Sequence, residues 1–248
     1  MNGLATPRPL PQPGHRYDVA VVGAGLAGSE LAWRLALSGR DVLLVTQALD
    51  NVGNLYHSRV PGPFPAGTLF EAARTRALPD DTNWALHRQV KYLLERAPGI
   101  HLLQSCVSTL HVNSQGPHVL GTWEGPPLRA DAVVLAVGSF LNARLNIGGV
   151  VEDAGRLSEV AYDFLWRDLE AQGVTFEEAE GAWKGEDGGL PYEVRFLTLA
   201  PEELENFRLK RWRGVFALGR GAPGELDYGE VLRQAERLAE TLLGELSA

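Results

Sequence analysis

Three glycines near the start of the chain have the spacing of a phosphate-binding turn. Gly23, Gly25 and Gly28 form the pattern G-x-G-x-x-G, which follows a valine-rich stretch, 17–22, and opens a segment with helical spacing of apolar residues, 29–39. In such a turn the first glycine permits a tight bend, the second lets the backbone approach a pyrophosphate, and the third lets the helix pack closely. The pattern therefore predicts a dinucleotide site, with a glycine-rich turn that binds no ligand as the alternative.

The ribose side of this predicted site departs from the usual pattern. A second strand, 41–46, completes a βαβ unit, but no acidic residue stands ~20 residues past the last glycine. Thr46 and Gln47 occupy that place, and Asp50 is the first carboxylate after the strand. Ribose contacts would then come from the Thr46 hydroxyl, the Gln47 amide or backbone groups. This absence weakens an interpretation as an NAD protein more than one as an FAD protein.

Two further strands end in glycine, and together with the first they favour FAD. DAVVLAVGSF (131–140) has the form of the strand by which many flavoproteins return near the adenine, and GVFALGRG (214–221) that of the terminal strand that meets the flavin. A helix expected from Tyr228 to about Leu246 would then point its first turn at the flavin. The sequence predicts non-covalently bound FAD, and a plain Rossmann dehydrogenase remains the alternative.

These elements predict an α/β fold of the FAD/NAD(P)-binding, Rossmann-like type, with three layers, a parallel central sheet and a small β-meander crossover. We expect helices near 69–76, 82–97 and 158–171, and β-like stretches at 100–112, 118–123 and 131–137. The stretch 174–213 is expected to be irregular. In terms of domains, we expect a disordered lead-in at 1–16 and one FAD-binding domain at 17–248, with a small cap or insertion at about 140–212.

Composition narrows the classes of function. The chain has 248 residues and a net charge of −8. Its single cysteine excludes an internal disulfide framework and a multi-cysteine metal site. No histidine or carboxylate spacing suggests a metal. No apolar run reaches the ~20 residues of a membrane helix, so we expect no membrane partner and a cytoplasmic location. The net charge argues against nucleic-acid binding.

Three side chains are candidates for chemistry at a flavin. His57 could donate or accept a proton, or be a surface loop histidine. Arg220 could stabilise reduced, anionic flavin near N1 and C2=O, or pair with a nearby carboxylate or the FAD phosphates. Tyr228 could stack on or hydrogen-bond to the ring system, or pack at the start of its helix.

Two other features have simpler interpretations. Cys106 lies in an apolar stretch with no base nearby in sequence, so we expect a buried structural thiol rather than a nucleophile. The basic stretch 208–213, RLKRWR, contains an aromatic residue and could contact RNA. In an acidic chain we expect it to be a solvated face.

The longest patterned segments resemble the glucose-inhibited division protein A family (GidA, or MnmG), together with its folate-dependent tRNA methyltransferase relatives. The likeness lies in VVGAGLAGSELAWRLA, LLVTQALDNVGN, VVLAVGSFLNARLNIGG and the segment from Gly214 to Leu243. The family also has threonine where other flavoproteins have an acid. By resemblance, the FAD contacts fall on Gly23, Ala24, Gly25 and Gly28 at the pyrophosphate, Thr46 and Gln47 at the ribose, Val107, Ala136, Val137 and Gly138 at the adenine, and Gly219 and Arg220 at the flavin.

The resemblance also has departures. His57 stands about where the family has a cysteine, and the stretch 177–189, EEAEGAWKGEDGG, replaces the family's "LKTGTP" loop. Family members that modify tRNA carry an inserted domain and a helical C-terminal domain that help to hold tRNA. The resemblance therefore implies a short GidA-related form without these domains, and we expect no tRNA binding by this chain alone.

Three hypotheses about function follow. The first is an FAD-dependent oxidoreductase of unknown substrate, reduced by NAD(P)H or by a protein redox partner. The second is a non-catalytic FAD-binding partner of a tRNA wobble-uridine modification complex. The third is a folate- or tRNA-linked transferase that acts with a separate partner chain.

Overall fold

The computed structural model describes residues 12, 14–123, 125–185, 190–219 and 227–246. Most of the expected N-terminal lead-in lies outside this described part. Within it, Arg16 already belongs to the first strand, and His15 forms an ion pair with Asp41 at 2.7 Å. The first strand thus includes Arg16, one residue before the expected start of the FAD-binding domain.

Parallel strands form the centre of the molecule. In order across the sheet they are β15 (Val215–Ala217), β6 (Leu128–Leu135), β1 (Arg16–Val22), β2 (Val42–Thr46) and β3 (Ile100–Gln104). β1 pairs in parallel with β2 on one side and with β6 on the other. The strands are rich in valine and leucine because both faces of the sheet are covered. This arrangement confirms the predicted α/β, Rossmann-like fold.

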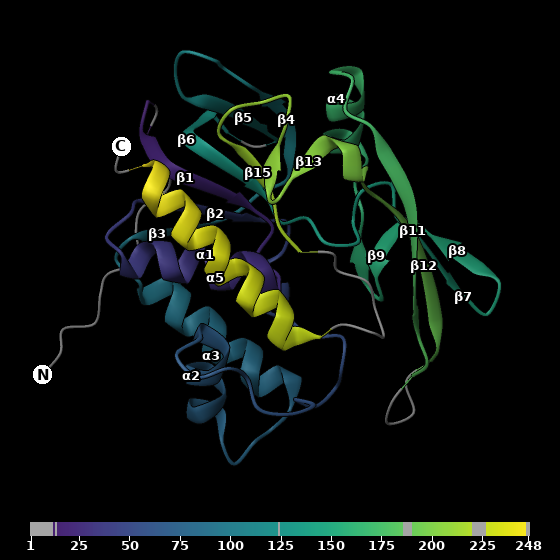
Figure 1. The fold of residues 1–248 in the computed structure, drawn as a ribbon. Coiled ribbons are helices and arrows are strands. Elements are labelled where there is room, and N and C mark those ends of the chain that lie inside the picture. Colours follow the sequence, from purple (N-terminus) through teal and green to yellow (C-terminus); the bar gives the residue numbers. More distant parts are fainter. Residues whose placement is uncertain (1–11, 13, 124, 186–189, 220–226, 247–248) are drawn as a thin grey trace, which may run out of the picture.

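Helices cover one face of this sheet (Figure 1). The apolar side chains of the helices share one hydrophobic cluster with alternate residues of β1 and β2, such as Val19, Val21 and Val42. The helices are α1 (Leu26–Leu37), α2 (Leu69–Ala77), α3 (Asn83–Arg96) and α5 (Tyr228–Glu245), with a short 3₁₀ turn, η1 (Leu49–Asn51), after β2. α1 and α5 pack directly against each other. The helices expected near 69–76, 82–97 and 228–246 are thus confirmed.

A β-meander covers the opposite face. β4 (Val107–His111) pairs antiparallel with β5 (His118–Thr122), and β5 pairs antiparallel with β6. Their buried residues form a second cluster with Ala20 and Leu43 of the central strands. The helix α4 (Phe164–Ala171) packs on β4. This meander leads from β3 back to β6, as predicted for the crossover.

A separate antiparallel sheet forms the cap. Its strands, in spatial order, are β11 (Phe176–Trp183), β12 (Tyr192–Leu199), β7 (Arg144–Ile147) and β8 (Val150–Glu152). The hairpin β9 (Ala154–Arg156) and β10 (Glu159–Val160) lies against it. The cap has a small core of its own, in which alanine, leucine and valine side chains surround Tyr192 and Phe196. Figure 1 shows the β11–β12 pair to one side of the central sheet.

Two expectations about the cap were wrong. The stretch 174–213 is not irregular, because Tyr192, Val194 and Phe196 are buried between exposed Glu193 and Arg195, which is the period of a strand. The helix expected over 158–171 begins only at Phe164. Ser158 has a positive φ of 63° and precedes β10, so it does not cap the helix.

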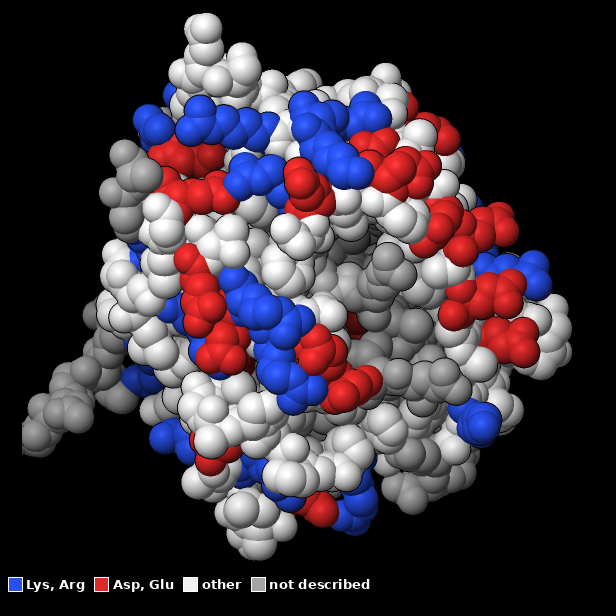
Figure 2. Space-filling view, in the orientation of Figure 1, with Lys and Arg blue, Asp and Glu red and all other residues white. Residues whose placement is uncertain are grey.

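Two arginines of the basic stretch 208–213 form ion pairs with acidic residues of the same chain. It spans β14 (Arg208–Leu209), which pairs with β13 (Leu204–Glu205) beyond β15. Arg208 pairs with Glu245, and Arg211 pairs with Glu203 at 2.7 Å. Lys, Arg, Asp and Glu side chains are interspersed over the face that carries α5 (Figure 2). Among the described residues no helix is long and apolar enough to span a membrane.

Glu203 connects three segments of the chain. It lies in the 3₁₀ turn η2 (Pro201–Glu203), and both of its carboxylate oxygens accept hydrogen bonds from Arg211 at 2.7 Å. The Thr175 backbone N–H and hydroxyl also donate to it, at 2.9 and 2.8 Å. These donors, Arg211 first, lower the pKa of Glu203 to about 2.

The lowered pKa of Glu203 predicts that its contacts stabilise the fold less at acidic pH. The stabilisation from Glu203 is present above its unfolded-state pKa, and it is lost as pH falls from about 4.5 toward 2. We expect Glu203→Gln to lower the free energy of unfolding by about 1–2 kcal/mol near pH 7, allowing for solvent screening. Denaturant unfolding of both proteins between pH 3 and 7 should show this difference shrink toward pH 3. A difference independent of pH would contradict the assignment.

Candidate cofactor-binding site

A cavity of about 360 Å³ opens at the carboxyl ends of the central strands. It lies between the central sheet with its helices and the cap, and the surface in Figure 2 is hollowed between α5 and the cap. Its volume falls in the range of small-molecule sites. The predicted residues that line it are Gly23, Ala24, Gly25, Thr46, Gln47, Val107, Ala136, Val137, Gly138, Gly219 and Tyr228.

The glycines of the first turn have different structural roles. Gly23 has a φ of +107°, and an added Cβ would lie 2.3 Å from the carbonyl oxygen of Ala136. Gly28 is buried in α1, where a Cβ would lie 1.9 Å from the carbonyl oxygen of Gly23. A Cβ on Gly25 would meet no atom within 4 Å, because this residue faces the cavity. Gly23 and Gly28 therefore permit close packing, whereas Gly25 keeps the cavity open.

The start of α1 carries free hydrogen-bonding capacity. The helix begins after Gly25, which offers no side-chain cap, and its first turn has no acidic residue. By contrast, Thr68, Thr82 and Asp227 cap α2, α3 and α5 through their side chains. The first N–H groups of a helix have no partner within it and carry its positive partial charge. The first turn of α1 therefore directs N–H groups and positive potential at the cavity.

The ends of β2 and β3 form one side of the cavity. Thr46 is half-buried, and its hydroxyl donates to the Ala48 carbonyl at 3.3 Å. Gln47 is exposed. Val107 and Cys106 follow β3, and the thiol is buried, as expected from the sequence. No carboxylate lies among the described lining residues from these two strands.

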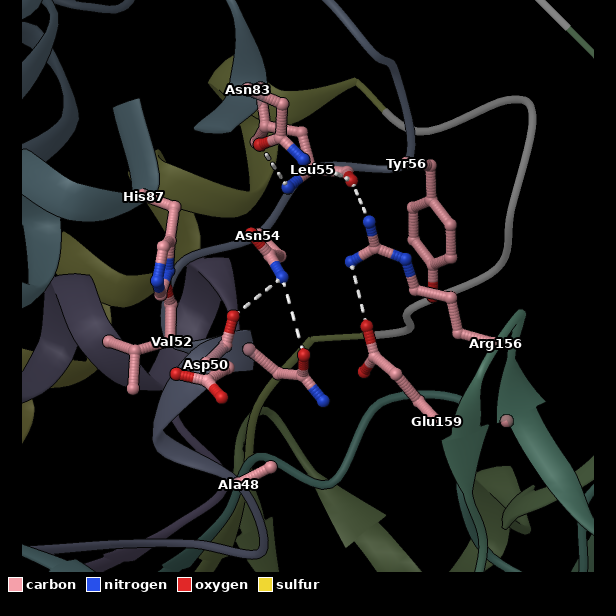
Figure 3. Close-up of polar contacts among 12 residues, drawn as sticks. Ala48, Asp50, Val52, Asn54, Leu55, Tyr56, Asn83, His87, Arg156 and Glu159 are labelled. Carbon is pink, nitrogen blue, oxygen red and sulfur yellow. Dashed lines mark hydrogen bonds and ion pairs between the residues drawn. The ribbon is translucent and has the colours of Figure 1, made fainter. Parts of the chain in front are cut away.

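Charged lining residues come from the cap hairpin, which sequence reasoning missed. Arg156 and Glu159 are the charged side chains among the described residues that line the cavity. The Arg156 guanidinium donates to the Leu55 carbonyl, lies 3.4 Å from Glu159 and stacks 5.1 Å from the centre of the Tyr56 ring (Figure 3). No motif marked them, since the hairpin has no sequence pattern of its own.

Burial affects the ionisation of the side chains around Arg156. It raises the pKa of Glu159, and Arg156 opposes that shift only in part. Burial also raises the pKa of Tyr56, whose hydroxyl hydrogen-bonds to Ser139 at 3.1 Å. Ser139 in turn donates to the Gly155 carbonyl at 2.8 Å. Glu159 and Tyr56 are therefore less readily ionised in this site than they would be in water.

Tyr228 ties the start of α5 to the loop after β2. Its hydroxyl accepts the Tyr56 N–H at 3.0 Å and hydrogen-bonds to Nδ1 of His57 at 2.8 Å. Burial raises the pKa of Tyr228 to about 12. His57 packs edge-on against Trp183 of the cap at 5.0 Å and is not among the described lining residues. His57, predicted as a proton donor or acceptor, thus contacts Tyr228, which lines the cavity. Arg220 lies outside the described residues.

A family model described as "Glucose inhibited division protein A" matches residues 18–76 and 72–184, which is more than half of the chain. The chain belongs to the GidA family. This family consists of FAD-binding flavoproteins related to MnmG. The matched ranges include the glycine turn, the end of β2, the end of β6 and the cap hairpin with Arg156 and Glu159.

Individual relatives agree with this membership. The "tRNA uridine 5-carboxymethylaminomethyl modification enzyme MnmG" of Chlamydia muridarum is 31% identical over 189 residues, covering 63% of this chain and 30% of the relative. The chain thus aligns with about a third of that relative. The crystal structure of the GidA-related protein from Thermus thermophilus is 45% identical, with a TM-score of 0.83, covering 92% of this chain and 99% of that one.

A more distant structure shares the fold alone. Aquifex aeolicus GidA in its form II crystal is 14% identical, with a TM-score of 0.76 over 92% of this chain and 64% of that chain. The likeness to the Thermus protein extends over nearly the full length of both chains. The shared arrangement therefore extends well beyond the central sheet.

The glycine geometry leads to a stability prediction. We expect Gly28→Ala to destabilise the flavin-free protein by about 1–3 kcal/mol, because its Cβ would collide with the Gly23 carbonyl. Gly25→Ala should cost less than about 1 kcal/mol, since only a helix-cap preference is lost. Denaturant unfolding of the two variants tests this order. Equal costs would show that α1 can move away from the turn.

Proposed function

We propose that this chain binds FAD non-covalently in the cavity and acts as a flavin-dependent oxidoreductase whose substrate is unidentified. The observation that carries the proposal is the open space at Gly25, directly before the uncapped start of α1. A pyrophosphate needs such a place, where backbone N–H groups are free and no side chain intrudes. Membership of a flavoprotein family supports the choice of FAD.

The order of the strands suggests how the two halves of FAD are held. We propose that the turn at Gly23, Ala24 and Gly25 binds the pyrophosphate, while Gly28 keeps α1 close to the sheet. On the β2 side, Thr46 and Gln47 would bind the ribose through hydroxyl and amide groups. The adenine would lie toward Val107 and the segment from Ala136 to Gly138, and the flavin toward Gly219, Arg220 and Tyr228.

Arg156 and Glu159 of the cap would lie beside bound FAD. Bound FAD supplies two-electron redox chemistry. Arg156 provides a fixed positive charge in a partly buried site, where it offsets negative charge on a ligand. Glu159 lies 3.4 Å from Arg156 and helps to fix the position of that charge at the cavity. The hydrogen bonds of Tyr228 leave His57 as a positioning residue for this tyrosine.

A second candidate is a non-catalytic FAD-binding partner of a tRNA wobble-uridine modification complex. The observation in its favour is the tRNA modification activity named for the Chlamydia relative, which matches 63% of this chain. The interspersed charges on the α5 face give tRNA no continuous basic surface there (Figure 2). We therefore place the oxidoreductase before this second candidate. Its source of electrons would be NAD(P)H or a protein redox partner. The single buried cysteine suits a cytoplasmic setting.

Spectroscopy distinguishes these candidates. We expect the purified protein to be yellow and to lose its flavin absorbance on anaerobic addition of NADH or NADPH. Bleaching by either nucleotide supports the oxidoreductase. A yellow protein that stays oxidised with both, and that co-purifies with a partner, supports the second candidate. A protein that remains colourless after incubation with FAD would overturn both.

A substitution at Gly25 tests the placement of the pyrophosphate. Gly25→Val puts a branched side chain into the open space of the cavity, where its Cβ would meet no atom within 4 Å, so we expect a folded but colourless protein. Gly244→Val is the matched control, because Gly244 lies at the exposed end of α5 and a Cβ there also meets nothing within 4 Å. Retention of FAD by Gly25→Val, measured by absorbance and by thermal unfolding, would show that the phosphates lie elsewhere.

A further inference from the structure

Three aromatic rings meet beside the cavity, and one of them, Tyr162, lines it. Trp123 follows β5, while Tyr162 and Phe164 lie at the start of α4. The Trp123 ring packs edge-on against Tyr162 at 4.6 Å and against Phe164 at 5.3 Å, and Tyr162 and Phe164 stack at 6.4 Å. Trp123 is 46% exposed and Phe164 is 50% exposed. Exposed aromatic side chains that gather at a cavity are suited to bind a ligand.

The ring cluster adjoins a defined end of the cavity. Val107 pairs with Thr122 across the β4–β5 ladder, so Trp123 comes directly after the residue opposite Val107. Leu165, next to Phe164, packs in the same hydrophobic cluster as Val107. Tyr162 and Leu165 both line the cavity. The three rings therefore stand beside the stretch that follows β3, away from the start of α5.

The strand order indicates which part of a dinucleotide reaches this end. The glycine turn follows β1, and β2 and β3 lie successively to one side of it, while β6 and β15 lie to the other. In this fold the nucleoside half runs from the turn across the end of β2. Its base therefore arrives beyond β2, at the stretch from Ser105 to Val107, where the aromatic rings stand.

We propose that Trp123, Tyr162 and Phe164 form an adenine-binding corner, in which Tyr162 contacts the base and the other two rings hold Tyr162 in place. This inference rests on the proposed binding of FAD and names the residues that distinguish FAD from FMN, which lacks the adenine. Stacking suits this role because it recognises a flat ring while the glycine turn holds the phosphates. Under this proposal Tyr162 is the specificity-determining residue, and Trp123 is a positioning residue that acts through Tyr162.

The test compares two flavins. Isothermal titration calorimetry of the flavin-free full chain gives dissociation constants for FAD and FMN. We expect Tyr162→Ala to weaken FAD binding about tenfold or more and to change FMN binding less than twofold. Tyr162→Phe should keep the affinity for FAD, and Trp123→Ala should weaken it by an intermediate factor. Trp84→Ala is the matched control, since Trp84 is 61% exposed and stacks on His87 of α3.

Each outcome separates this inference from the proposed function. Equal loss of FAD and FMN affinity in a folded Tyr162→Ala protein, or no loss of either, overturns the adenine corner and leaves FAD binding intact. ADP serves as a second probe if the wild-type protein takes no flavin. ADP binding that depends on Tyr162 would then support the corner and overturn the flavin. Failure of the wild-type protein to bind FAD, FMN and ADP overturns both proposals.

Discussion

The close approach of α1 to the glycine turn is the contact on which the rest of the site depends. Gly28 lies so near the Gly23 carbonyl that no Cβ fits between them, and Gly23 lies too close to the carbonyl of Ala136, directly after β6, to carry a Cβ. Gly23 also donates its N–H to Val45 of β2 at 2.8 Å. The ends of three neighbouring strands and the start of one helix are thus held against a single turn. Because the backbone itself fills this space, the remaining room lies in front of Gly25.

A buried carboxylate extends this arrangement to the loop after β2. Glu30 of α1 is fully buried, pairs with Arg34 at 2.8 Å and accepts the Leu69 N–H at 2.9 Å, where α2 begins. Burial, opposed by Arg34, raises the pKa of Glu30 to about 7. Arg34 also pairs with Glu236 of α5. At the other end of the loop, Gly53 donates to the Ala24 carbonyl at 2.8 Å. The loop that carries Tyr56 and His57 is therefore fixed at both ends to α1 and its turn.

Sequence patterns predicted the elements that depend on residues within a short stretch of the chain. The turn around Gly25, the parallel strands and the helix from Tyr228 could be recognised because glycine spacing, valine runs and helical periodicity each lie within a short stretch. Arg156 could not be recognised, since its importance comes from a carbonyl a hundred residues away in sequence. His57 was placed by a cysteine position in relatives, and the structure gives it contacts with Tyr228 and Trp183 that no local pattern indicated. The strand at 192–199 did carry a signal, because charged Glu193 and Arg195 alternate with buried neighbours at the period of a strand, and the expectation of irregular structure overlooked it.

The cap and the central sheet contribute different kinds of interaction to one cavity. The sheet side provides backbone groups and small residues, which suit any dinucleotide, while charge comes from Arg156 and Glu159 of the hairpin. Arg156 is held by the Leu55 carbonyl, and the next residue, Tyr56, bonds through its N–H to Tyr228. A shift of the hairpin would therefore disturb the loop and the start of α5 together. The position of Arg156 at the cavity and the position of the final helix are consequently linked through the same few contacts.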